Sequence, residues 1–112
     1  MTHYLAELYS PKPAWLALDQ DGRLAFFQAI NAGMGALSAL GVEAIAMGEI
    51  APDTLCAPPH RFFALWRAPD AAAMQALVSG IAASGWHEYF DTLNATGAGL
   101  DLTGHLGQLI AA

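Results

Sequence analysis

The order of strand-like and helix-like segments restricts what this chain can fold into. Alternating patterns typical of strands occupy residues 3–9, 42–50, 60–67 and 91–97. Apolar residues at helical spacing fill the two long intervals, residues 21–40 and 70–84. The order strand, helix, strand, strand, helix, strand fits two interleaved right-handed crossovers. It predicts an α+β, ferredoxin-like βαββαβ sandwich: a four-stranded antiparallel sheet in the order 4-1-3-2 with both long helices on one face.

Capping residues mark the ends of the predicted helices. Asp19 or Asp21 can cap the first long helix, and Gly41 stands where a left-handed residue ends it. Asp70 can cap the second long helix, which Gly85 ends. Both helices are therefore bounded by residues suited to those positions.

Two further features concern the helices. Gly33 and Gly35 lie inside the first long helix and weaken it by about 1 kcal/mol each relative to alanine, which predicts close packing or a bend there. A short C-terminal helix is also expected, capped by Asp101 and reaching Ile110.

The positions of the charged residues predict which face of the sheet packs against the helices. Burying an unpaired ion costs several kcal/mol, so charged side chains are expected on the face that the helices leave bare. By this criterion Phe62, Ala64 and Trp66 point toward the helices. The residues assigned to the bare face are Glu7, Glu43, Ile45, Met47, Glu49, Arg61, Phe63, Leu65, Arg67, Thr92, Asn94 and Thr96.

The chain carries little charge for its length. Charged residues make up 12% of the 112 residues, about half the usual fraction, and the net charge is −6. The length fits one domain, residues 1–112. Four Lys and Arg residues are too few to neutralise a phosphate backbone or an anionic membrane surface, so no nucleic-acid or membrane partner is expected.

Three features predict a cytoplasmic protein. Cys56 is the single cysteine, the sequence shows no targeting segment, and no apolar run is long enough to span a bilayer.

The low charge and the bare sheet face together predict a homodimer. Ile45, Met47, Phe63 and Leu65 would form an apolar patch that a second copy of the chain can cover. The expected arrangement places the two sheets face to face. The alternatives are that the alanine-rich composition alone explains the low charge, or that the C-terminal helix covers the bare face.

Three segments resemble the dimeric α/β-barrel superfamily, which includes the YCII-like and antibiotic-monooxygenase-like families. They are the strand His60–Arg67, the helix start Ala68–Asp70 and the segment Gly85–Phe90. The resemblance in topology covers residues 3–97. The chain looks most like the small uncharacterised bacterial members of the superfamily. The resemblance implies a ferredoxin-like dimeric barrel that holds a small, often aromatic or polyketide-like molecule in a cleft between sheet and helices. The catalytic patterns of the characterised groups are absent, so the resemblance implies no active-site residue.

Glu7 and Glu49 are the acid/base candidates. Each is expected on a face that dimerisation makes dry, where burial raises the pKa of a carboxyl group and suits it to proton transfer. The alternative is a structural role, in which each pairs with Arg61 or Arg67 across the interface.

Apolar and aromatic side chains and one amide are the ligand-binding candidates. They are Tyr9, Met47, Phe63 and Asn94. The four histidines lack the spacing of a metal site, so neither a metal nor another cofactor is expected.

Two functional hypotheses follow. In the first, a small apolar or aromatic molecule binds between the sheet and the first long helix. The resemblance implies that such a protein could be a cofactor-free enzyme of secondary or catabolic metabolism, performing proton transfer or oxygenation. In the second, the chain is a non-catalytic dimeric structural or interaction module. A polar cavity between the sheet and that helix would favour the first.

Overall fold

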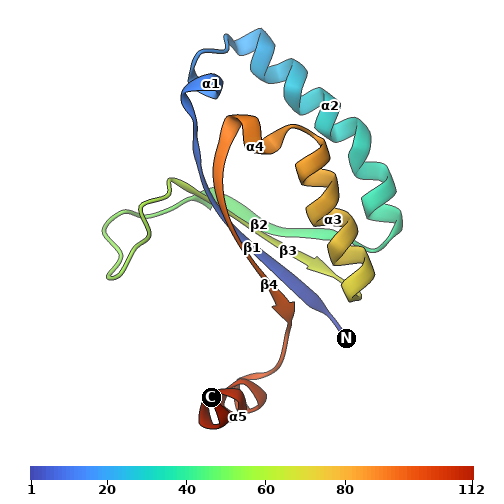
Figure 1. Cartoon of the computed structure of the whole chain (residues 1–112), viewed down its shortest axis with the longest axis vertical. Helices are drawn as coiled ribbons and strands as arrows, with labels where there is room; N and C mark the ends of the chain where they lie inside the picture. The colour runs from blue at the N-terminus through green and yellow to red at the C-terminus, as the bar shows by residue number, and fades with distance from the viewer.

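The computed structural model of the protein describes residues 1–112. The chain forms four strands and five helices (Figure 1). In chain order they are β1 (His3–Pro11), α1 (Pro13–Leu16), α2 (Gln20–Ala39), β2 (Glu43–Glu49), β3 (Phe62–Ala68), α3 (Ala71–Ala83), α4 (Trp86–Tyr89), β4 (Phe90–Ala98) and α5 (Leu102–Ala111). None of the helices is long and apolar enough to cross a membrane.

The strands form one antiparallel sheet in the order β2-β3-β1-β4, which confirms the predicted order. Helices α2 and α3 lie on the same side of this sheet (Figure 1). The buried core lies between the sheet and α3, where Leu5 and Trp66 meet Met74 and Leu77. The predicted α+β architecture with both long helices on one face is therefore confirmed.

The predicted caps are also confirmed. Asp19 Oδ1 accepts a hydrogen bond from Gly22 N at 2.7 Å, which begins α2 one residue later. Asp70 caps α3 in the same way, because its Oδ1 accepts a hydrogen bond from Ala73 N at 2.8 Å. Gly41 follows α2 with a φ of 86°, in the left-handed region that a side chain would disfavour.

Gly33 and Gly35 do not mark close packing, which was one of the two predicted alternatives, the other being a bend. A Cβ atom added at either position would meet nothing within 4 Å outside the helix. Helix α2 also has no fully buried residue. The two glycines therefore lie in an open stretch of a weakly packed helix.

Replacing Gly35 with alanine should raise the free energy of unfolding by about 0.5–1 kcal/mol, because alanine restricts the unfolded chain and meets no obstacle in the helix. Urea denaturation measures this change. Gly41→Ala is the matched control and should destabilise the protein, because φ is positive there and the new Cβ would lie 3.0 Å from Pro69 Cγ. A loss of stability in Gly35→Ala would contradict the open environment of α2.

The registers of β1 and β4 correct the predicted sheet faces. Residues directly opposite each other on neighbouring strands share a face. Glu7 lies opposite Ala64 of β3 and Asn94 of β4, so all three share the face that packs against the helices. The prediction that Glu7, Thr92, Asn94 and Thr96 lie on the bare face is therefore wrong. The charge criterion failed because it assumed an unpaired ion, whereas the Glu7 carboxyl is hydrogen-bonded and the β4 residues are uncharged.

A β-bulge in β2 changes the alternation of that strand. The register shifts between Ala44 and Ala46, so β2 carries one extra residue relative to β3. Beyond the shift Met47 lies opposite Ala64, on the side that faces the helices. The prediction that Met47 faces away from them is wrong for this reason. Glu49, at the end of β2, is exposed and likewise falls on the helix side in this register.

The opposite face of the sheet exposes large apolar side chains, as predicted for Leu65, whereas Phe63 on the same face is half-buried. Leu65 is 39% exposed and Leu93 is 58% exposed. Arg67 and Glu43 form an ion pair at its β2–β3 side. We call this surface the bare face.

Helix α5 lies apart from the rest of the chain (Figure 1). It has no buried residue, and Leu102, Leu106, Leu109 and Ile110 are all exposed. Its start is as predicted, since Asp101 accepts a hydrogen bond from Gly104 N at 2.8 Å. The apolar side of α5 therefore has no partner within this chain.

Candidate functional site

A large cleft separates helix α2 from the sheet. Its volume is about 1350 Å³, and most of its lining side chains are apolar. The sheet forms its floor through Tyr9, Met47 and Trp66, and α3 forms a side wall through Leu77 and Ile81. Three apolar side chains of α2 face the space: Leu24, Phe27 and Ile30. Met34 and Leu37, further along the same side of the helix, line the space and also pack against the edge of the core. We call this space the cleft.

Aromatic rings pack together at the end of the cleft where β1 ends and β4 begins. Tyr9 meets Phe62 at 5.9 Å between ring centroids and Trp86 edge-on at 5.1 Å. Trp86 stacks on Phe90 at 4.1 Å, and Phe90 meets Trp15 at 4.8 Å. These five rings form an aromatic cluster, a surface suited to a flat ligand.

Glu7 lies on the floor of the cleft and is only 3% exposed. Its Oε1 accepts a hydrogen bond from Trp66 Nε1 at 2.7 Å. Its Oε2 is buried and has no partner. Burial raises the pKa of Glu7, and the Trp66 hydrogen bond opposes that shift without cancelling it.

The environment of Glu7 determines what the carboxyl can do. In its neutral form Oε2 can donate a hydrogen bond to a ligand, and in its charged form it can accept a proton. Tyr9, two residues along the same strand face, also lines the cleft. Its pKa is raised by burial and, secondarily, by the negative charge of Glu7. The phenol therefore remains a hydrogen-bond donor through the neutral pH range.

The predicted site residues do not all come together. Glu7, Tyr9 and Met47 line the cleft. Glu49 is exposed and lies outside the cleft lining, and Phe63 lies on the bare face.

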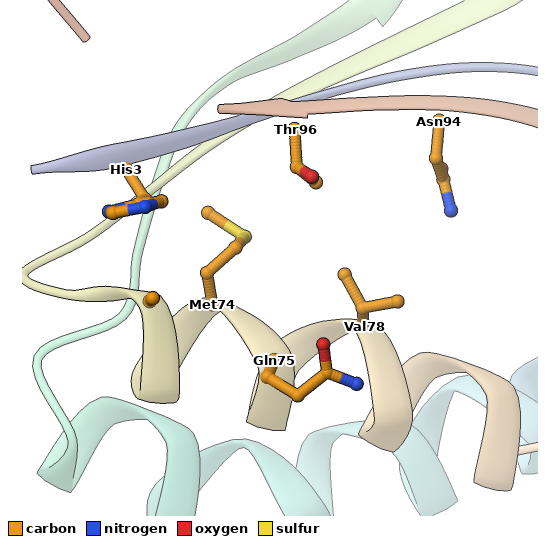
Figure 2. A pocket seen from close by; sticks show the side chains of 7 residues that line it. His3, Met74, Gln75, Val78, Asn94 and Thr96 are labelled. Carbon is orange, nitrogen blue, oxygen red and sulfur yellow. The ribbon is translucent and has the colours of Figure 1, made fainter. Parts of the chain in front are cut away.

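Asn94 lines a second, smaller pocket of about 300 Å³. Figure 2 shows Asn94, Thr96 and His3 pointing from the sheet toward Met74 and Val78 of α3. None of these polar side chains is a buried group without a partner. The pocket therefore lacks the unsatisfied buried carboxyl that distinguishes the cleft.

Sequence reasoning missed the two arginines of the cleft. Arg23 of α2 lines it, and Arg61, which was assigned to the bare face, lines it as well. It also missed that Trp66 is the hydrogen-bond donor to Glu7. The available signal was that a carboxyl in an otherwise apolar strand face needs a donor on the neighbouring strand, and tryptophan is such a donor.

Comparison with solved structures finds the same fold elsewhere. The crystal structure of TA0507, provisionally named a chlorite dismutase, superposes with a TM-score of 0.66 at 18% identity. The match covers 90% of this chain and 46% of that one, so this chain spans about half its length. A protein of unknown function from Rhodopseudomonas palustris, RPA0582, superposes with a TM-score of 0.59 at 14% identity, covering 89% of this chain and 83% of that one. Methylated RPA0582 superposes with a TM-score of 0.60 at 16% identity, and the match covers 90% of this chain and 82% of that one.

These identities show the fold alone, which is the ferredoxin-like α+β fold. No curated protein sequence matches the chain. One family model does match it, over residues 2–112. The chain therefore belongs to the family of unknown function DUF6616.

Proposed function

We propose that this protein binds a small apolar or aromatic molecule in the cleft, and that Glu7 exchanges a hydrogen bond or a proton with it. The observation that carries the proposal is Glu7 Oε2, a buried carboxyl oxygen without a partner in an apolar space. Buried polar atoms in proteins are nearly always hydrogen-bonded. A ligand in the cleft would supply the missing partner.

The walls of the cleft support the same proposal. Leu24, Phe27 and Ile30 of α2 face open space, and burying such side chains gives about 1.5–3 kcal/mol each. A ligand that fills the space would gain part of that free energy. An unfilled cleft favours a binding protein over a purely structural module.

Cofactor-free proton transfer is the chemistry that we propose for the cleft. A carboxyl with a raised pKa in a mostly apolar site is suited to general acid/base catalysis. The resemblance of the sequence to the YCII-like and antibiotic-monooxygenase-like families supports this reaction class. The aromatic cluster would orient a flat substrate beside Glu7.

We further propose that the protein is a homodimer whose bare faces pack together as a dimeric α/β barrel. The accessible surface of the chain is 7307 Å², whereas a compact monomer of 11.8 kDa has about 5,900 Å². Its radius of gyration, 15.8 Å, exceeds the roughly 13 Å of a compact domain of about this length. The total excess is about 1,400 Å², and part of it lies in the cleft and in α5. For comparison, each partner buries roughly 800 Å² in a standard interface.

The free, exposed thiol of Cys56 supports a reducing compartment, and we propose the cytoplasm.

The binding proposal is tested with 2-naphthol, a flat aromatic molecule that carries one hydroxyl. The indole N–H groups of Trp15, Trp66 and Trp86 all belong to side chains that line the cleft, so their NMR signals should shift in a saturable way. Trp66 should respond most, because its N–H is bonded to Glu7. Glu7→Leu should weaken binding about tenfold through loss of one hydrogen bond.

Glu49→Leu is the matched control, because it removes the same charge from a residue outside the cleft lining. It should leave the affinity unchanged. An absence of saturable shifts, or equal weakening by both variants, would overturn the proposal.

A further inference from the structure

We propose that the ligand of the cleft is an aromatic carboxylic acid whose carboxylate is held by Arg23 and attracted by Arg61. The inference rests on the proposed function and names the substrate class. Its basis is which of the four Lys and Arg side chains have partners and which do not.

Two of the four cations have partners away from the cleft. Arg67 forms an ion pair with Glu43 at the bare face. Lys12 Nζ donates to the backbone oxygen of His87 at 2.7 Å. The other two, Arg23 and Arg61, have no carboxylate partner, although the chain has ten Asp and Glu residues. Both of them line the cleft.

The two arginines flank the aromatic cluster. The guanidinium of Arg23 lies 5.6 Å from the ring centre of Trp15, and that of Arg61 lies 5.0 Å from the ring centre of Phe62. Trp15 and Phe62 are connected through Phe90 and Tyr9, which lie between them in the cluster. The positive groups and the flat apolar surface therefore occupy the same end of the cleft.

Arg23 is the residue with the stronger need for an anion. Its Nε is buried and has no partner, and its one hydrogen bond is a long one, from Nη2 to the backbone oxygen of Leu16 at 3.4 Å. The Arg23 side chain as a whole is half-buried, so a counter-ion would offset the partial loss of its hydration, and its planar fork matches a carboxylate. Arg61 is exposed, so its contribution is mainly attraction at the mouth of the cleft.

The charge balance of the cleft agrees with an anionic ligand. Glu7 is the single acidic side chain that lines it, against two arginines. The chain as a whole has a net charge of −6 and so repels anions elsewhere. A carboxylate would be accepted at the aromatic end, while the remainder of the ligand reaches the Glu7 carboxyl on the floor.

The test compares naphthalene-2-carboxylate with naphthalene-2-carboxamide, which has nearly the same shape and no charge. Isothermal titration calorimetry should show that the carboxylate binds at least tenfold more tightly, and that added salt reduces this preference. Arg23→Gln should remove the preference by weakening the carboxylate alone. Arg61→Gln should reduce it by a smaller factor.

Arg67→Gln is the matched control, because it removes the same charge from the bare face and should leave the preference intact. Arg23→Lys keeps the charge without the fork and should give an intermediate preference, which provides a second variant if Arg23→Gln does not fold. Equal affinities for the carboxylate and the amide would overturn the inference while the proposed function stands. Failure of both compounds to bind would also overturn the inference, and the proposed function falls with it only if 2-naphthol fails to bind as well.

Discussion

Replacing Phe63 with aspartate should convert the proposed dimer, of twice 11.8 kDa, into a monomer at micromolar concentration. The ring of Phe63 packs over Gly48 on the bare face, beside Leu65. In a dimer with facing sheets each aspartate would enter an apolar interface, and the two copies would introduce two uncompensated charges. Each substitution removes the roughly 1.5–3 kcal/mol of association free energy that a buried aromatic side chain contributes. It also adds the cost of burying an unpaired ion. Light scattering measures the mass directly.

Ala82→Asp is the matched control for this experiment. It adds the same charge to an exposed position on α3, which packs on the opposite side of the sheet. It should leave the mass unchanged. A mass near 11.8 kDa for the parent protein would contradict the dimer.

Glu7→Gln should alter how stability depends on pH. The pKa of Glu7 is raised in the folded protein, so between its unfolded and folded pKa values the folded state holds a proton that the unfolded state has lost. Unfolding then releases a proton, and the free energy of unfolding of the parent falls as pH rises. The slope is at most about 1.4 kcal/mol per pH unit, and the loss is complete above the folded pKa. Glutamine retains an oxygen that can accept from Trp66 and has no proton to lose.

Urea denaturation of both proteins from pH 4 to pH 9 measures this difference. The stability of Glu7→Gln relative to the parent should grow with pH and then become constant. Tyr9 does not interfere in this range, because its own pKa is raised above its ordinary value. Glu49→Gln, at an exposed position, should follow the parent curve. Parallel curves for Glu7→Gln and the parent would contradict the buried, unpaired state of Oε2.

Much of the fold could be predicted because its signals are local. Asp19, Gly41, Asp70 and Gly85 bound the two long helices through contacts within a few residues of chain. Once the strands and helices are placed, the handedness of the crossovers determines the strand order.

The sheet faces were predicted less well because they depend on contacts between distant residues. The charge criterion placed Glu7 outside, whereas Trp66, 59 positions later, donates the hydrogen bond that makes its burial tolerable. The extra residue near Ile45 reversed the alternation of β2, and no residue type in that stretch marks a bulge. Spacing showed that Leu24, Phe27 and Met34 share one side of α2, but spacing contains no information on the volume that they face.

The weak attachment of α2 has a consequence for how the site forms. This helix supplies one wall of the cleft, yet it buries no residue completely, and of its apolar side chains only Met34 and Leu37 pack against the core. We therefore expect its local free energy of opening to be smaller than that of α3, which contributes three buried residues. The proposed ligand would provide α2 with packing partners that the chain itself lacks. Ligand affinity and the ordering of α2 would then be one linked equilibrium, in which release of α2 from the sheet admits the ligand and binding restores its packing.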